Sequence, residues 1–291
     1  MPLQVWVGAI QVGCFAALIG LGYQLILRTA RIFMFPLGAI ASGGALLTSY
    51  LAVRNDWPFA LAALVGVLVG AAVAIVADIA VLRPIQERAA AGDELVVVVG
   101  TIGTLFAIQQ LDGTLFGRQS QRVPSFVEGS AFRFGGASIS PQWVLTVVAT
   151  LLIFVCGASM MKRAKFGRYM RAVGANPLAA RLMGVPERRL RAVAFGLGGA
   201  VAVIAGLFLG TRSGVRFDSG FEWAMLGFIA SIIGGSASVY GPLVGGLLVA
   251  LIQAFASFKL GPAWLDYTTL ALALVFFSVR PEGLFASKGR V

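Results

Sequence analysis

The stretch KRAKFGRYMRAVGANPLAARLMGVPERRLR, residues 162–191, is the most polar part of an otherwise very apolar chain. It holds nine lysines and arginines and a single acid, Glu187. Apolar runs long enough to cross a membrane lie on both sides of it. Because short basic loops stay on the cytoplasmic side of a membrane, this stretch predicts how the chain is oriented.

The composition of the 291-residue chain is that of a membrane protein. Hydrophobic residues make up 58% and charged residues 12%, and the mean hydropathy is +0.89. The apolar runs are continuous rather than alternating, which favours helices over a closed barrel. The formal charge of +11 is explained by basic residues in short loops, so the bilayer is the expected partner and nucleic acid is not. The predicted fold class is all-α, a polytopic transmembrane helical bundle forming one domain over residues 1–291.

Nine apolar segments are predicted as helices. They are 5–27, 32–53, 59–82, 94–116, 141–161, 191–210, 222–239, 240–258 and 263–279. The glycine-rich junction GGSASVYGPLVGG, residues 234–246, indicates either a tight turn between two spans or a re-entrant or broken pair near 222–258. About eight to nine spans are therefore expected.

The basic segment sets the expected topology. With loop 162–190 in the cytoplasm, counting spans places the N-terminus outside and the C-terminus inside. The loop 117–140 then falls outside, although it carries three arginines, because nine basic residues outweigh three. This external loop is either a small cap facing an external partner or a plain connector.

A short capped helix is predicted inside the basic segment. Asn176 suits the N-cap, Pro177 the first helical position and Gly184 the left-handed stop. A helix of about two turns is marginal in water and must be held by something else. It lies either on the lipid surface, with Arg181 toward the headgroups, or in a groove of a cytoplasmic partner. Its apolar side is formed by Leu178, Leu182 and Met183.

The sequence offers no catalytic constellation. Histidine is absent, so a Ser-His-Asp triad or a Cys-His pair cannot be built. Cys14 and Cys156 lie in separate apolar segments, and no phosphate-binding GxxxxGK[ST] loop occurs. The chain is therefore not expected to be an enzyme, or to bind a metal or cofactor itself. If ATP powers it, ATP and Mg²⁺ must be bound by partner subunits.

Polar residues within the predicted spans are the remaining candidates for contact with a solute. Each carries a cost in lipid and tends to face the interior of the bundle. Neutral glutamines serve either as hydrogen-bonding links between helices or as ligands. Asp78, near the inner end of its span and about one turn before Arg83, is assigned to the membrane interface. The other polar residues are Gln11, Gln24, Gln109, Gln110, Asp112 and Gln253.

Five blocks of this sequence, in this order, resemble LivH-type permease subunits of branched-chain amino acid ABC importers. The third is the most specific, because Ala179-Ala180-x-x-x-Gly184 is similar to the permease loop that contacts the ATPase. The blocks are VLRPIQ (81–86), TIGTLFAIQQ (101–110), GRYMRAVGANPLAARLMGV (167–185), GGSASVYGPLVGGLLVAL (234–251) and VRPEGLF (279–285).

The resemblance implies a permease of the bacterial inner membrane. It would form the translocation path for branched-chain amino acids or related small amino acids, amides or acids, driven by ATP hydrolysis in partner subunits. The implied partners are two cytoplasmic ATPases, a second and different, LivM-like permease, and an external substrate-binding protein. The implied ATPase-coupling helix consists of Asn176, Pro177, Leu178, Ala179, Ala180, Arg181, Leu182, Met183 and Gly184.

The sequence departs from this family in one place. After the first span, LivH-type permeases usually carry an Asn-Phe-Ala-His-Gly-like stretch, where this chain reads Met34-Phe35-Pro36-Leu37-Gly38. We therefore hypothesise a less polar solute, or one recognised mainly by the binding protein. Tight binding of strongly polar sugars alone by that protein would contradict this. The candidate path residues are Phe35, Pro36, Gly38, Gln109 and Gln110.

Two other classes of function remain open from the sequence. An ATP-independent secondary transporter or channel for small neutral solutes would support uptake in vesicles that contain no ATPase. A membrane scaffold subunit without a solute path agrees with the glycine-rich packing, but it leaves the helix resembling a coupling element unexplained.

Overall fold

A computed structural model describes residues 3–88, 94–127, 129, 132–134, 137–235 and 238–279. It confirms the predicted all-α membrane bundle. Among the described residues, seven helical segments could cross a membrane by length and composition, and two apolar helices are shorter, α10 (Ser219–Gly234) and α12 (Leu265–Val279). The seven are α1 (Leu3–Ala30), α2 (Pro36–Ser49) with the π-helix Tyr50–Arg54, α3 (Phe59–Ala77) with the π-helix Asp78–Leu82 and α4 (Arg83–Arg88), α5 (Glu94–Phe116), α6 (Pro141–Arg163), α9 (Glu187–Ser213) and α11 (Gly241–Leu260).

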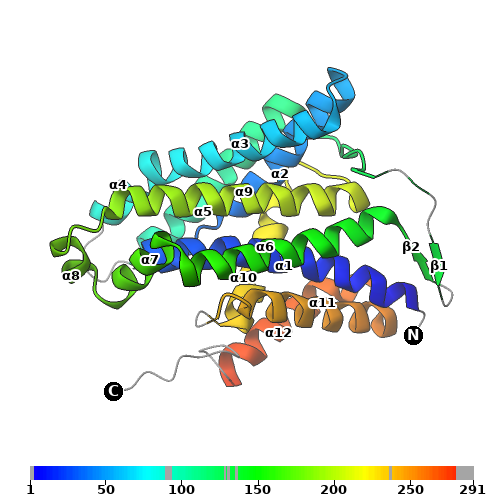
Figure 1. Cartoon of the computed structure of the whole chain (residues 1–291). Coiled ribbons are helices and arrows are strands. Elements are labelled where there is room, and N and C mark those ends of the chain that lie inside the picture. The colour runs from blue at the N-terminus through cyan, green and yellow to red at the C-terminus, as the bar shows by residue number, and fades with distance from the viewer. Residues whose placement is uncertain are drawn as a thin grey trace.

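The two ends of the bundle differ in what they carry (Figure 1). The helices α7 (Lys165–Ala175) and α8 (Pro177–Leu182) lie at one end, and the start of α1 lies at the other. There a small hairpin, β1 (Phe132–Phe134) paired antiparallel with β2 (Ala137–Ile139), occupies part of the predicted loop 117–140. The end of α12 points toward the α8 end, away from the start of α1. Which side is cytoplasmic stays a prediction, and the block 279–285 lies almost wholly outside the described residues.

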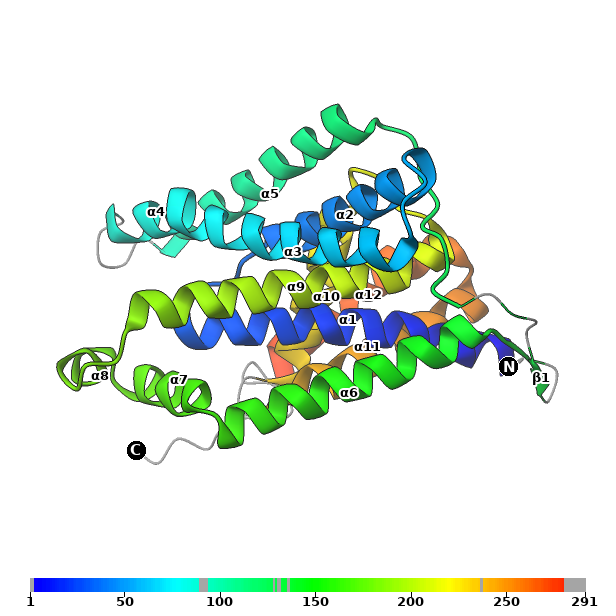
Figure 2. The ribbon, with the colours of Figure 1, turned by 45° about the horizontal axis from the view of Figure 1, so that its top comes forward.

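Helix α1 is the centre of the bundle. It packs against α9, α10 and α11, and α5 and α6 lie on opposite sides of it (Figure 2). Small residues permit this close contact: a side chain at Gly13 would meet Leu247, and one at Gly20 would meet Pro242. In lipid, where there is no hydrophobic drive between helices, such small residues let backbones approach.

Helix α2 begins inside the bundle rather than at its edge. The predicted helical segment 32–53 is helical only from Pro36, and the residues before it are not helical. Proline has no N–H to donate and restricts the residue before it, so it favours the first position of a helix. The chain reverses at Arg31, which has a positive φ of 55°. Non-helical backbone at this depth is tolerated because protein buries it.

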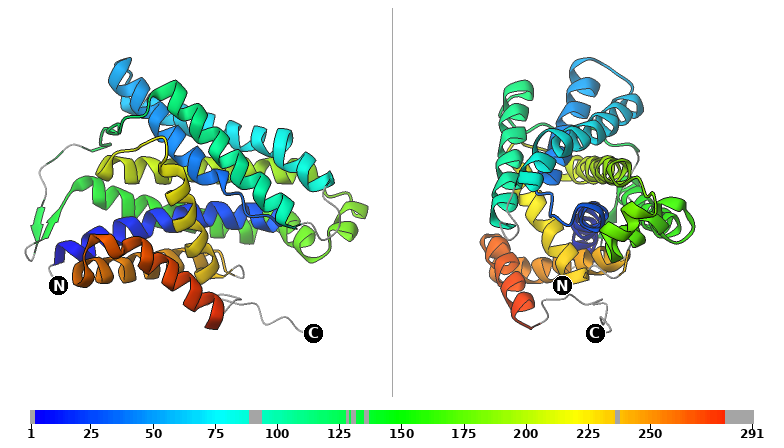
Figure 3. Two further views of the ribbon diagram at one scale, coloured as in Figure 1. Left: turned by 180° about the vertical axis from the view of Figure 1, so that it is seen from behind. Right: turned by 90° about the vertical axis from the view of Figure 1, so that its left-hand side faces the viewer.

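Helix α10 lies across the bundle and not along it (Figure 3). It has 16 residues, about 24 Å of helix, which is less than the roughly 30 Å thickness of a bilayer core. The Tyr23 hydroxyl of α1 donates to the Ala224 carbonyl (3.2 Å), and the Gln24 amide donates to the Gly235 carbonyl (2.6 Å). The glycine-rich junction 234–246 thus lies between the end of a short transverse helix and the start of α11, so the pair near 222–258 is interrupted.

Candidate functional site

The helix α8 carries the caps that the sequence predicts. The Asn176 side chain accepts a hydrogen bond from the Ala179 N–H (3.0 Å). Gly184 has a φ of 78°, and the Val185 N–H donates to the Ala180 carbonyl (3.0 Å). This last bond is the long-range bond of a Schellman motif, which ends a helix in the left-handed conformation. The boundaries of α8 are therefore set by local hydrogen bonds.

Two contacts hold α8 against the bundle. Ala180 is buried in an apolar cluster with Met170 of α7 and Leu190 of α9. Arg181 forms an ion pair with Glu187, the first residue of α9. The hydrogen bond from Arg181 to Glu187 raises the pKa of the arginine. Through these contacts α8 is connected directly to the start of a central membrane helix.

The opposite side of α8 is open. Leu182 is 83% exposed and Met183 is 84% exposed. The side chains of Pro177 and Leu178 lie outside the described part of the chain. Of the three residues predicted on the apolar side, Leu182 and Met183 are therefore the two that are described. Helix α8 sits at the tip of the bundle, beyond the end of α1 (Figure 2). Leu182, the last residue of α8, and Met183, its C-cap, thus form a small exposed apolar surface.

A buried ion cluster joins three helices near the α8 end. Asp78 is fully buried, and its carboxylate contacts Arg83 at 2.8 Å and Arg191 at 2.6 Å. Arg191 also donates to the Gln86 side chain (2.7 Å), which in turn donates to the Ala30 carbonyl at the end of α1 (3.0 Å). The cluster therefore links the α3–α4 segment, α9 and α1. It also borders a basic cavity of about 890 Å³ beneath the segment that follows α8.

The cluster as a whole is not visible in the sequence. The place of Asp78 at the membrane interface near Arg83 stays a prediction, and the structure adds that Asp78 is buried and also binds Arg191. Asp78 and Arg83 are brought together by the π-helix Asp78–Leu82, whose wider turn suits a pair five residues apart. Arg191 is 113 residues away along the chain, so only its position at the start of a predicted span was visible from the sequence.

Four of the five candidate path residues pack between helices. Phe35, Pro36, Gly38 and Gln109 are buried, whereas Gln110 is exposed on the surface of α5. The structure brings the four together where the start of α2 meets the start of α10. Gln110 points away from this junction, so the five do not form one surface.

The junction of α2 and α10 is very close. A side chain at Gly38 would meet the Gly220 carbonyl and lie 2.5 Å from the Ala224 nitrogen. Gln109 of α5 donates to the Asp218 carbonyl just before α10 (2.9 Å). These contacts fix the first turn of α10 against α2 and α5.

Asp112 lies at the contact between α5 and α2. Its side chain is buried, and a Cβ at Gly43 would lie 2.5 Å from its Oδ2 atom. That oxygen has no hydrogen-bond partner among the described residues. Glycine at position 43 is therefore what leaves room for the carboxyl group.

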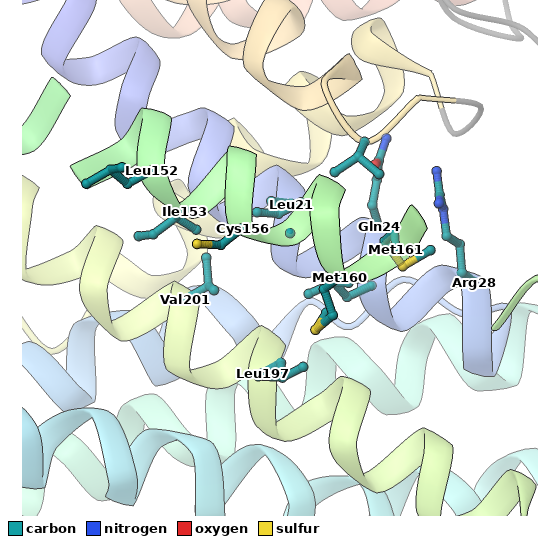
Figure 4. A pocket seen from close by; sticks show the side chains of 13 residues that line it. Leu21, Gln24, Arg28, Leu152, Ile153, Cys156, Met160, Met161, Leu197 and Val201 are labelled. Carbon is teal, nitrogen blue, oxygen red and sulfur yellow. The ribbon is translucent and has the colours of Figure 1, made fainter. Parts of the chain in front are cut away.

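An apolar cavity of about 410 Å³ lies on the other side of the bundle, between α1, α6 and α9 (Figure 4). Leu152 and Ile153 of α6 and Val201 of α9 line it, and its polar side chains, Gln24 and Arg28, belong to α1 toward the α8 end. A small-molecule site normally combines apolar walls with several converging polar groups. This cavity lacks such convergence and is typical of a surface that faces lipid.

The fold and these sites define a class of protein. A helical membrane bundle with interrupted helices meeting in its interior, and a capped helix protruding from one end, is the architecture of a membrane permease. Residues 7–279 match the family described as "Branched-chain amino acid transport system / permease component". The chain belongs to this family, which confirms the resemblance seen in the five sequence blocks.

Full-length relatives are transport permeases. The high-affinity branched-chain amino acid transport system permease protein LivH of Salmonella typhimurium is 24% identical, covering 97% of this chain and 94% of the relative. BraD of Pseudomonas aeruginosa, with the same description, is 27% identical and covers 97% and 95%. The xylose transport system permease protein XylH of Escherichia coli is 35% identical, but over only 42% of this chain and 32% of its own length.

A solved structure shares the fold. PsaBC from Streptococcus pneumoniae, determined in complex with a Fab, aligns with a TM-score of 0.50 at 15% identity, covering 96% of this chain and 92% of that chain. At this identity the likeness concerns the arrangement of the helices alone.

Proposed function

We propose that this chain is the permease subunit of an ATP-driven importer of the bacterial inner membrane, for branched-chain amino acids or related small amino acids, amides or acids. It works with two cytoplasmic ATPases that bind ATP and Mg²⁺, a second, LivM-like permease and an external substrate-binding protein. Helix α8 is the coupling helix through which the ATPases move the bundle. The N-terminus lies outside and the C-terminus in the cytoplasm.

The observation that carries this proposal is the geometry of α8. Its caps define a short unit of less than two turns, and Leu182 and Met183 project from it without support from the described part of the chain. Ala180 and Arg181 attach the same unit to α9. A helix bound on one side to a membrane span and open on the other is suited to transmit the motion of a docked partner.

The substrate class comes from the full-length relatives. LivH and BraD, which align over nearly the whole chain, are described as branched-chain amino acid permeases. The xylose permease aligns over less than half of it. The proposed substrate class is therefore taken from the relatives that align over nearly the whole chain.

Replacing Leu182 and Met183 by aspartate should separate the chain from its ATPases. The substitutions add two charges to an apolar docking surface and touch nothing else, so the fold should be retained. If these two residues are the hot spots of the interface, their loss costs at least about 2 kcal/mol, or roughly 30-fold in affinity. Copurification of tagged permease with the ATPases measures this, together with leucine uptake in proteoliposomes.

The matched control is Val53→Asp. Val53 is 63% exposed and lies in the π-helix at the opposite end of the bundle. This variant should keep its ATPases. Unchanged ATPase association after the Leu182 and Met183 substitutions, or after deletion of residues 176–184, would disprove the coupling role. Uptake by vesicles without any ATPase would instead support the ATP-independent transporter.

A further inference from the structure

The basic cavity at the α8 end is built from segments that are far apart in the chain. It lies among the end of α1, the helix α4 and the segment that joins α8 to α9, which are found at the same end of the bundle (Figure 2). Its volume of about 890 Å³ is that of a site for a small molecule. All basic residues that line it are arginines: Arg31, Arg83, Arg181, Arg188, Arg189 and Arg191.

The positive charge of this cavity exceeds the negative charge around it. Its six arginines face two lining glutamates, Glu87 and Glu187, and the buried carboxylate of Asp78. Three positive charges are therefore in excess, and a recess lined by one sign of charge attracts the opposite sign. The lining arginines that form no ion pair within the described part of the chain are Arg31, Arg188 and Arg189, and all three are exposed.

The first turn of α9 adds backbone donors to the same wall. Helix α9 begins at Glu187, and its N-cap, Pro186, supplies no side-chain cap. Both residues line the cavity, together with Arg188 and Arg189. The N–H groups of a first helical turn have few partners within the helix, and the helix dipole favours an anion beside them. The arginine side chains and this helix end therefore act on the same space.

The cavity lies at the depth where three segments long enough to cross a membrane end. Ala30 is the last residue of the first, Arg88 ends the segment that contains α3 and α4, and Glu187 begins the segment of α9. The polar headgroups of a bilayer lie just beyond such ends. Basic pockets between membrane helices at this depth bind anionic headgroups, and the planar fork of arginine matches two phosphate oxygens at once.

Other basic residues at this end have different surroundings. Lys162 and Arg163 at the end of α6, and Lys165 and Arg168 in α7, are exposed and do not line the cavity. The orientation of the chain in the membrane is enough to explain such scattered charges. It does not explain why arginines from four separate segments converge on one recess.

We propose that this cavity binds a phosphate group, supplied either by the headgroup of an anionic phospholipid or by a small soluble phosphate compound. Arg188 and Arg189 at the start of α9 and Arg31 after α1 donate to its oxygens, and the first turn of α9 faces its charge. The inference does not depend on the proposed function. A phosphate held here would connect the start of α9, which carries α8, to the end of α1.

Binding of two phosphate probes to the purified full-length chain tests this site. In the first arm, the chain is extracted from vesicles of equal parts phosphatidylglycerol and phosphatidylcholine, and native mass spectrometry measures which lipid it retains. In the second arm, pyrophosphate is titrated calorimetrically into the chain in phosphatidylcholine nanodiscs. Preferential retention of phosphatidylglycerol identifies a lipid headgroup as the source of the phosphate. Saturable binding of pyrophosphate identifies a soluble compound.

Replacing Arg188 and Arg189 by glutamine should weaken binding of the effective probe at least roughly tenfold, because charge-assisted hydrogen bonds to phosphate are lost. The matched control is Lys162→Gln with Arg163→Gln. It removes the same charge from an adjacent pair at the same end but outside the cavity, so binding should change little. Arg31→Gln, in a different segment, should also weaken binding, independently of any effect on the start of α9.

Equal weakening by the two double variants would show that phosphate is attracted only by the general charge of this end, and would overturn the proposal. Failure of both probes to bind would overturn it as well. If neither probe binds and the Arg188 and Arg189 variant loses its copurifying ATPases, the cavity instead receives acidic side chains of a protein partner.

Discussion

Replacing Asp78 by alanine is expected to destabilise the protein by about 3–5 kcal/mol, the usual cost of removing one partner from a buried ion pair. Asp78 is fully buried, and the substitution leaves Arg83 and Arg191 side by side without their shared counter-charge. The thermal denaturation midpoint of the purified protein in detergent should fall accordingly. Removing Arg191 as well should recover part of the loss, because the two single effects share one interaction.

Asp218→Ala is the matched control for this prediction. Asp218 forms an ion pair with Arg216 at 2.8 Å, but both side chains are about half exposed. Exposed pairs contribute roughly 0–1 kcal/mol, so this variant should denature close to the wild type. Equal shifts for the two aspartate variants would show that the Asp78 cluster is not a structural link between α9 and the α3–α4 segment.

Under the proposed function, the Asp78 cluster would also take part in coupling. Glu187 at the start of α9 binds α8, and Arg191, one turn later, binds Asp78. A displacement of α8 therefore reaches the α3–α4 segment and the end of α1 through one turn of helix. Variants that fold but loosen this link should hydrolyse more ATP for each solute imported.

Replacing Gly38 by alanine is the second change with a large expected effect. The added methyl group would lie 2.5 Å from the Ala224 nitrogen and closer still to the Gly220 carbonyl. Both are backbone atoms of α10, so relief requires a shift of a whole helix. Overpacking of this kind typically costs about 1–3 kcal/mol and occasionally more. Thermal denaturation in detergent measures the loss.

Gly103→Ala makes the same chemical change in a helix with free space around it. Apart from the backbone of its own helix and its chain neighbours, no atom of the described residues lies within 4 Å of the new methyl group. Since alanine favours a helix over glycine by about 1 kcal/mol in both places, that gain cancels in the comparison. A denaturation midpoint for Gly38→Ala equal to that of Gly103→Ala would contradict the close junction of α2 and α10.

Local sequence patterns predicted the parts of the fold that depend on neighbours in the chain. The caps of α8, Asn176 and Gly184, act within a few residues of themselves, so their hydrogen bonds can be anticipated from residue type and spacing. Pro36 likewise marks the start of α2, although the predicted segment began four residues earlier. The apolar runs indicated membrane helices because their length matches the thickness of the bilayer core and their side chains are apolar like the lipid tails.

Contacts between distant residues could not be predicted in this way. Asp78 and Arg191 are 113 residues apart, and Phe106 and Phe221 meet only because α10 lies across the bundle. A single sequence shows that a residue is polar and lies within a span. It does not show which side of the span that residue occupies.

The sequence by itself determined that this protein is a helical membrane bundle with a capped helix in a basic segment. Capping residues act on their neighbours in the chain, and the composition and length of the apolar runs are matched to the surrounding lipid. These features can therefore be recognised in the sequence alone. The tertiary structure alone decided what each polar residue in a span faces. Gln109 and Gln110 are adjacent, yet one holds α10 in place and the other is exposed on the α5 surface. Adjacent side chains on a helix point in different directions. Which neighbour each of them faces depends on how the other helices pack around it.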